Sequence, residues 1–270
     1  AWIEYETDAN DVFWARVDRT RKIPVTSLLR AIGVITDEQI VELFGEEAKI
    51  LASIQKDPIK TQDEALIEIY KKLRPGELPT VDAARNLFNG LFFDPRRYDL
   101  AKVGRYKFNK KLSLASRISG KVAFDTIVDP ETGEVLVEKD SVISEEVAEN
   151  IQNAGINVVD VKVEDSKVRI IGNGTVNIHK HLPNVDVSDL HIKEYVNFGV
   201  LKSIIDSTEE AKLHDAIKER MEELVPKHVT TEDIIASISY LLNLDHGLGV
   251  IDDIDHLGNR RIRCVGELLQ

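Results

Sequence analysis

The pattern of apolar residues changes in the middle of this chain, and that change constrains the fold more than any other feature. Apolar positions recur at helical spacing in residues 36–45, 61–73 and 80–93, and the same spacing returns in residues 230–247. From about Ser113 the chain instead carries short runs of β-branched residues separated by turn residues. We therefore predict an α+β fold in which a mainly helical part is interrupted by a small β-rich module.

Local signals mark where individual elements begin and end. Threonine side chains at the first position of a helix accept hydrogen bonds from its free backbone N–H groups. Such threonines precede four helical patterns: Thr36, Thr61, Thr80, and either Thr230 or Thr231. Ser144 and Gly155 bound a short helix within the β-rich part, and residues 207–225 form a charged helical pattern. Residues 2–25 alternate apolar and polar side chains around the turn "DAND", which predicts a β-hairpin.

The composition is that of a soluble globular protein, with 270 residues, 43% hydrophobic and 30% charged. No run of eighteen apolar residues occurs, so we expect no membrane span, and no secretory signal is visible. Cys264 is the single cysteine, which excludes an internal disulfide and a cysteine-rich zinc site and fits a reducing cytoplasm. Because the chain starts at Ala1 without methionine and stops within a helical pattern, we expect a fragment of a longer protein.

Charge is distributed unevenly along the chain. The formal net charge is −12, which argues against a simple polyanion-binding protein. Residues 95–112 nevertheless carry seven Lys or Arg against one Asp. Residues 129–165 carry eleven acidic residues against two lysines. The basic stretch indicates where a polyanion would bind, and the acidic stretch indicates where it would not.

A second charged cluster lies in the stretch "DDIDHLGNRRIRC", residues 252–264. It lacks the oxygen ligands of an EF-hand loop, although Asp253, Asp255 and His256 leave a metal site open as an alternative. A second interpretation is local ion pairing with the three arginines that follow. A third is a surface for single-stranded nucleic acid, because a carboxylate can accept hydrogen bonds from an unpaired guanine edge while arginines hold phosphate.

Aromatic residues near the amino terminus supply the other half of such a surface. Trp2, Tyr5, Phe13 and Trp14 are candidates for stacking on bases, although for any one of them a place in the core is the more frequent outcome. The histidines have no metalloprotease spacing, and no phosphate-binding glycine loop or nucleophile elbow occurs. The chain therefore carries no enzyme signature.

Three long stretches closely resemble the β subunit of bacterial DNA-directed RNA polymerase. They are "ETDANDVFWARVDRTRKIPVTSLLRAIG", "KLRPGELPTVDAARNLFNGLFFDPRRYDLAKVGRYKFNKKL" and "DDIDHLGNRRIRCVGELLQ". The resemblance implies the lobe, or β2 domain, of that subunit, divided into residues 1–112 and 230–270. Residues 113–229 look like a lineage-specific insertion, with a β-rich part at 117–200, similar to sandwich-barrel modules, and a helical part at 201–226.

The resemblance implies roles for five residues. In this family the lobe forms a wall of the DNA cleft and binds the single-stranded non-template strand of promoter DNA. Trp2 matches a tryptophan that stacks on a non-template base, and Asp255 with Arg260 matches a pocket that reads a non-template guanine. Arg74 and Arg97 match arginines that approach the strand further upstream. We expect the guanine pocket to be incomplete here, because in the family it also draws on residues that precede Ala1.

The resemblance also implies partners and a division of labour. The partners are DNA, the β′, α and ω subunits and a sigma factor, in the cytoplasm at the nucleoid. The catalytic magnesium belongs to β′, so we expect no cofactor and no catalytic residue in this chain. Two rival functions remain open. One is a protein-interaction scaffold whose insertion recruits a transcription factor, and the other is a metal-dependent hydrolase built on Asp253, Asp255 and His256.

Overall fold

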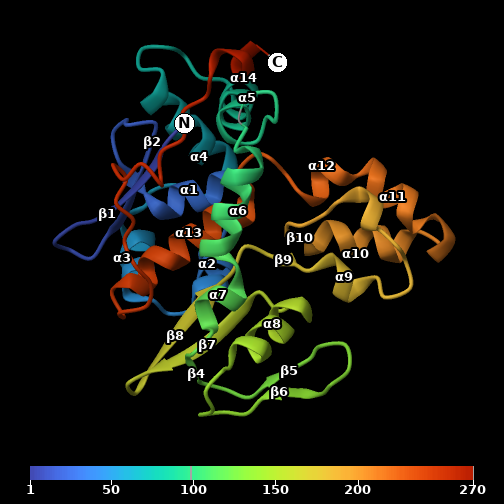
Figure 1. Cartoon of the computed structure of the whole chain (residues 1–270). Helices are drawn as coiled ribbons and strands as arrows, with labels where there is room; N and C mark the ends of the chain where they lie inside the picture. The colour runs from blue at the N-terminus through green and yellow to red at the C-terminus, as the bar shows by residue number, and fades with distance from the viewer. Residues whose placement is uncertain (98, 270) are drawn as a thin grey trace.

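A computed structural model describes residues 1–97 and 99–269, and it confirms the α+β class. Buried apolar side chains form three separate clusters, which we call the first, second and third cores. Figure 1 shows three corresponding bodies, and the helix α6 (Ala101–Leu112) runs from the first to the second. A short helix, α14 (Val265–Leu269), lies near the carboxyl terminus.

The first core is built from both ends of the chain. Its elements are β1 (Ile3–Thr7), β2 (Phe13–Val17), β3 (Ile23–Pro24), α1 (Val25–Ala31), α2 (Asp37–Phe44), α3 (Ala48–Lys56), α4 (Gln62–Leu73), α5 (Val81–Phe92) and α13 (Thr231–Leu244). The strands form an antiparallel sheet in the order β1-β2-β3, with Tyr5 opposite Ala15. The hydroxyls of Tyr5 and Ser237 lie 3.0 Å apart, which joins the hairpin to α13.

The predicted caps are present. Thr36, Thr61 and Thr230 each form a complete capping box, and the Thr80 hydroxyl accepts a hydrogen bond from the Ala83 N–H. Gly45 follows α2 with φ +77°, a conformation that a residue with a side chain rarely adopts. The predicted hairpin is also confirmed, because β1 and β2 pair on either side of the turn.

The second core is formed by residues 114–170 together with Leu248, and this stretch is the β-rich part of the chain. Its elements are α7 (Leu114–Ile118), β4 (Val122–Ala123), β5 (Ile127–Val128), β6 (Val135–Val137), α8 (Glu145–Asn153), β7 (Val158–Val163) and β8 (Ser166–Ile171). The strands form antiparallel sheets in the orders β4-β7-β8 and β5-β6, and within residues 1–97 and 99–269 no sheet closes into a barrel. Strand β8 lies against α13, where the Ile171 N–H donates to Ser239 Oγ at 3.0 Å.

The third core comprises residues 175–225 and is mainly helical. Its elements are β9 (Thr175–Val176), α9 (Ile178–His181), η1 (Ser188–Leu190), β10 (Val196–Asn197), α10 (Phe198–Ser207), η2 (Glu210–Lys212), α11 (Leu213–Glu219) and α12 (Met221–Leu224). The change from β-rich to helical thus falls near Gly174, whereas the sequence placed it at residue 201. The single helix predicted over 207–225 is divided into η2, α11 and α12, because the backbone leaves helical geometry at Arg220.

All three cores meet at one buried ion pair. Arg105 on α6 donates through Nη1 to both carboxylate oxygens of Asp233 on α13, at 3.1 and 2.9 Å. Arg105 Nε donates to the Pro226 carbonyl at 2.8 Å, and Asn173 Nδ2 donates to Asp233 at 3.2 Å. The chain therefore enters and leaves the third core beside the same pair.

Candidate nucleic-acid interface

Trp2 stands immediately before β1 at the open end of the β1–β2 hairpin. Its carbonyl accepts a hydrogen bond from the Asp18 N–H at 2.7 Å, which fixes the backbone there. The side chain projects outward, since the residue is 48% exposed, and the Arg19 guanidinium lies 5.7 Å from its ring centroid. An exposed indole beside a cation has the chemistry needed for stacking on a base.

The other candidate aromatics have structural contacts. Trp14 donates from its indole N–H to Asp8 at 2.8 Å, and this hydrogen bond holds the pKa of Asp8 below its usual value. Phe13 is buried in the first core and stacks on Tyr5 with ring centroids 5.6 Å apart. Burial raises the pKa of the Tyr5 hydroxyl. Of the four aromatics, Trp2 is therefore the one that is available to a ligand.

Asp255 and Arg260 lie together on an exposed turn. The Asp255 N–H donates to Asp253 Oδ1 at 2.9 Å, and Asn259 Nδ2 donates to the Asp253 carbonyl at 2.9 Å. Hydrogen bonds to Asp253 and from Asn259 therefore hold the shape of the turn. Arg260 Nη1 lies 3.6 Å from Asp255 Oδ1, with side-chain exposures of 62% and 83%. Such an exposed pair contributes about 0–1 kcal/mol. A ligand can therefore separate it at little cost.

The remaining charges of this segment attach it to α6. Asp252 forms an ion pair with Lys111 at the end of α6. Arg261 donates to the Leu100 carbonyl at 3.1 Å, and Arg263 donates to the Asp99 carbonyl, both at the start of α6. Within residues 252–264 the ion pair that the structure describes is thus Asp255 with Arg260, whereas Arg263 binds backbone and Arg261 binds both backbone and the Glu267 carboxylate. No three His, Cys, Asp or Glu side chains of the described residues are grouped as metal ligands.

Arg74 and Arg97 are both exposed, but they lie at opposite ends of α5. Arg74 follows α4 and lies 3.5 Å from Glu77, and Arg97 follows α5 and lies 3.8 Å from Asp94. Between them in the chain lies α5, a twelve-residue helix about 18 Å long. They could contact one extended strand at separate nucleotides, but they do not form one pocket.

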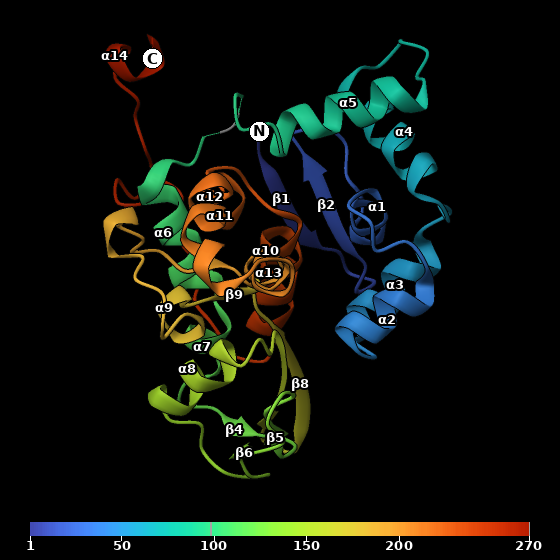
Figure 2. The same ribbon diagram turned by 90° about the vertical axis from the view of Figure 1, so that its right-hand side faces the viewer.

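Taken together, the five predicted residues occupy four places, and only Asp255 and Arg260 contact each other. Figure 2 shows the N-terminus, the end of α5, the loop into α6 and the C-terminal segment following one another along the upper edge. The five residues therefore do not form one cavity.

One of the basic residues in the stretch 95–112, which was predicted to bind a polyanion, is buried. Arg105 is 3% exposed and bound to Asp233, so it cannot contact a polyanion. Lys102, Lys107 and Lys110 on the same helix are exposed. The sequence could not separate these residues, because the partner of Arg105 lies 128 positions away.

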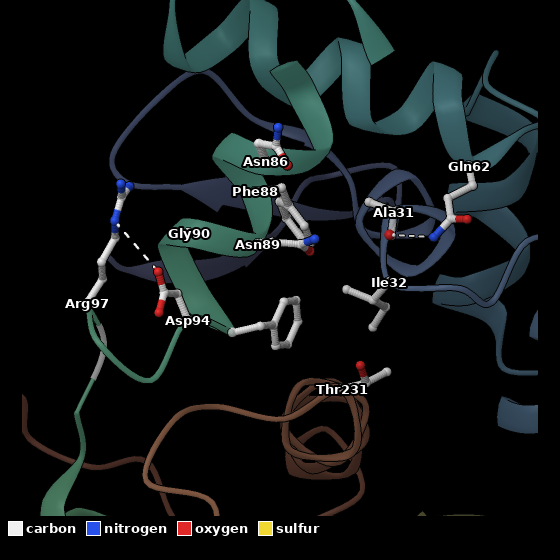
Figure 3. A pocket seen from close by; sticks show the side chains of 11 residues that line it. Ala31, Ile32, Gln62, Asn86, Phe88, Asn89, Gly90, Asp94, Arg97 and Thr231 are labelled. Carbon is white, nitrogen blue, oxygen red and sulfur yellow. Dashed lines mark hydrogen bonds and ion pairs between the residues drawn. The ribbon is translucent and has the colours of Figure 1, made fainter. Parts of the chain in front are cut away.

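One pocket lies beside Arg97, and the sequence analysis did not predict it. It has a volume of about 540 Å³ and lies between the end of α1, the start of α4, one face of α5 and the start of α13. Figure 3 shows Asn89 on α5 and Thr231 on α13 on one side of the α5 ribbon, with Arg97 on the other. The spacing of Asn86, Asn89 and Gly90 along α5 was the available signal, because positions three and four apart share a helix face.

Comparison with known proteins identifies the family. The chain is an α+β domain with an interrupted core, and the family described as RNA polymerase Rpb2, domain 2, matches residues 1–126 and 207–263. The chain belongs to that family. Residues 127–206, which the match leaves out, lie inside the predicted insertion.

Bacterial relatives match the whole chain. The DNA-directed RNA polymerase subunit beta of Clostridioides difficile strain 630 is 58% identical, and that of Alkaliphilus oremlandii strain OhILAs is 60% identical, each over 272 residues. The corresponding subunit of Acetivibrio thermocellus is 56% identical over 274 residues. In each case the match covers 100% of this chain and 22% of the relative, so the chain spans about a fifth of their length. No described helix is long and apolar enough to cross a membrane.

Proposed function

We propose that this chain acts within the β subunit of a DNA-directed RNA polymerase, as a wall of the DNA cleft that binds the single-stranded non-template strand. The observation that carries the proposal is the exposed Asp255–Arg260 pair at 3.6 Å. An aspartate on a nucleic-acid surface repels phosphate but accepts hydrogen bonds from guanine N–H groups. Unpaired guanine presents those groups, whereas in a duplex they are occupied by cytosine.

The neighbouring arginine completes the recognition. Arg260 can donate to the guanine carbonyl or to a phosphate once the ligand separates the pair. Neutralising the carboxylate removes an acceptor that can bind two N–H groups of the guanine edge, whereas the adenine edge offers only one such group. The expected effect is a loss of base preference, with little loss of overall strand binding.

Trp2 and the exposed arginines supply the parts of the proposed site that do not depend on sequence. Stacking on an aromatic ring contributes on the order of 1–3 kcal/mol per base and tolerates any base. Arg97 and Arg74 are paired loosely with carboxylates on the surface and can exchange them for phosphate oxygens. Because few phosphates are neutralised, we expect the isolated chain to bind DNA weakly.

The test is cross-linking of non-template DNA in an assembled polymerase whose β subunit carries this chain. Promoters with guanine or adenine at each single-stranded position are compared for wild type, Asp255→Ala and Asp255→Asn. The matched control is Asp165→Ala, an exposed aspartate in the turn between β7 and β8. Preference for guanine at one position should disappear only in the Asp255 variants. Survival of that preference in Asp255→Ala would show the base-reading assignment to be wrong.

The remaining parts of the proposal concern partners. We propose that the chain assembles with the β′, α and ω subunits and a sigma factor at the nucleoid, and that β′ holds the catalytic magnesium. The chain itself then contributes strand binding and no chemical step. Manganese and magnesium titration calorimetry on the chain tests the rival hydrolase, which requires a bound cation at Asp253, Asp255 and His256.

A second candidate function is a scaffold at the insertion, favoured by the hairpin β5–β6. Val128 and Val135 pair across it and are 43% and 50% exposed. Residues 124–149 around them contain nine acidic residues and one lysine. An apolar pair within an acidic surface suits a basic protein and repels DNA. Val128→Thr combined with Val135→Thr should abolish factor binding to the polymerase while promoter opening persists.

A further inference from the structure

We propose that the pocket between α4, α5 and the start of α13 receives one unstacked base of the bound single strand. The proposal rests on the function proposed above, and it adds a subsite at which a base is held in an open pocket. The pocket volume of about 540 Å³ falls within the range of about 300–1,000 Å³ typical of small-ligand sites. That volume is ample for one nucleotide.

The first argument is the hydrogen-bonding capacity of the walls. Asn86 and Asn89 lie three residues apart on α5 and line the pocket, and both are exposed. Within the described part of the chain, neither side-chain amide has a hydrogen-bond partner. Across the pocket, Gln62 Nε2 donates to the Ala31 carbonyl at 3.1 Å, which fixes its amide and leaves its oxygen available (Figure 3). Amides carry donors and acceptors together, as the edge of a base does.

The second argument is the aromatic floor. Phe88 and Phe93 both line the pocket, and their ring centroids are 5.9 Å apart at an interplanar angle of 62°. Phe88 is 2% exposed, so the ring cluster is fixed by the first core rather than by the ligand. A rigid apolar floor below polar rims fits a planar heterocycle, which is apolar on its faces and polar at its edges.

The third argument is charge. Arg97 and Asp94 are the charged residues that line the pocket, so their charges cancel. A neutral polar ligand therefore suits the interior better than a free phosphate does. Arg97 is 72% exposed, and a side chain at Gly90 would approach its Nη1 to 3.1 Å, so the guanidinium lies directly over α5. From there it can hold the phosphate next to the base in the pocket.

The experiment uses the assembled polymerase on promoter DNA, with 5-iodo-2′-deoxyuridine placed in turn at each single-stranded non-template position. We expect one position to cross-link to the peptide containing residues 86–93. Asn89→Leu keeps the number and branching of the side-chain heavy atoms but removes the amide, and it should lower that cross-link about fivefold or more, as for the loss of a base-edge contact. Asn150→Leu, at an exposed position of α8, is the matched control and should leave it unchanged.

The outcomes separate this inference from the function on which it rests. Cross-links to Trp2 or Arg97 without any to residues 86–93 would overturn the pocket and leave the strand-binding function intact. A cross-link at 86–93 that Asn89→Leu and Asn150→Leu affect equally would also overturn it. If no position cross-links anywhere on the chain, the proposed function fails together with the pocket.

Discussion

Arg105 on α6 and Asp233 on α13 form an ion pair 2.9 Å long in which both side chains are almost completely buried, at 3% and 1% exposure. The remaining donors of Arg105 bind the carbonyls of Pro226 and His228. The Thr230 N–H donates to Asp233 at 3.0 Å as part of the α13 capping box. One pair thus joins α6, the start of α13 and the chain returning from the third core.

Breaking this pair should destabilise the chain strongly. Arg105→Met leaves the Asp233 carboxylate buried without its cation, and such changes cost about 3–5 kcal/mol. Urea unfolding should therefore show a much lower free energy of unfolding. The matched variant is Arg85→Met, because Arg85 pairs with Asp63 at 2.9 Å on the surface, where the expected cost is about 0–1 kcal/mol. Equal losses in the two variants would refute the role assigned to the buried pair.

The third core should be removable without unfolding the rest. Both of its ends are held beside Arg105 and Asp233, so a short Gly-Ser linker replacing residues 175–225 should close the gap. We expect circular dichroism and urea unfolding to show a folded first core. Replacing residues 114–171 instead should fail, because Ile171 belongs to the first core and its N–H is bound to Ser239. A molten or aggregated product from the 175–225 replacement would contradict the prediction.

His214 should titrate above its ordinary pKa. Its Nε2 lies 2.8 Å from Asp189 Oδ1, and this hydrogen bond, followed by that to Asp215, raises the pKa of the imidazole. The charged pair stabilises the third core at low pH, fully below the ordinary value of about 6.5, and is lost as pH rises through the higher folded value. NMR titration should show a lower His214 pKa in Asp189→Asn. The control Asp165→Asn, in the second core, should leave it unchanged.

The two tryptophans should separate binding from folding. Trp2→Ala removes an exposed ring and should change the free energy of unfolding by no more than about 0.5 kcal/mol. In the assembled polymerase, it should weaken non-template strand binding by about 1–3 kcal/mol. Trp14→Ala should instead lower the free energy of unfolding and leave strand binding unchanged. The reason is that the Trp14 indole donates a hydrogen bond to Asp8, and its ring centroid lies 4.9 Å from Lys22 Nζ. If Trp2→Ala lowers the free energy of unfolding more than Trp14→Ala does, the assignment of Trp2 to the ligand surface is wrong.

The features that were predicted correctly from the sequence depend on residues that lie close together in the chain. Caps such as Thr61 with Glu64 act over three residues, and the pair of Asp255 with Arg260 acts over five, so both were visible in the sequence. The helices α1 and α3 went unpredicted. The helix α6 was counted only as a basic stretch, because its charged face hid the buried Arg105.

The sequence by itself determined the local structure of this protein: the hairpin, the capped helices, the β-rich interruption and the family resemblance. The tertiary structure alone decided which charges are buried, where the second and third cores divide, and that Asn86, Asn89 and Thr231 share a pocket. The reason is physical. A cap or a hairpin is stabilised by neighbours in the chain, whereas burial and enclosure depend on elements that folding brings together from more than a hundred residues apart.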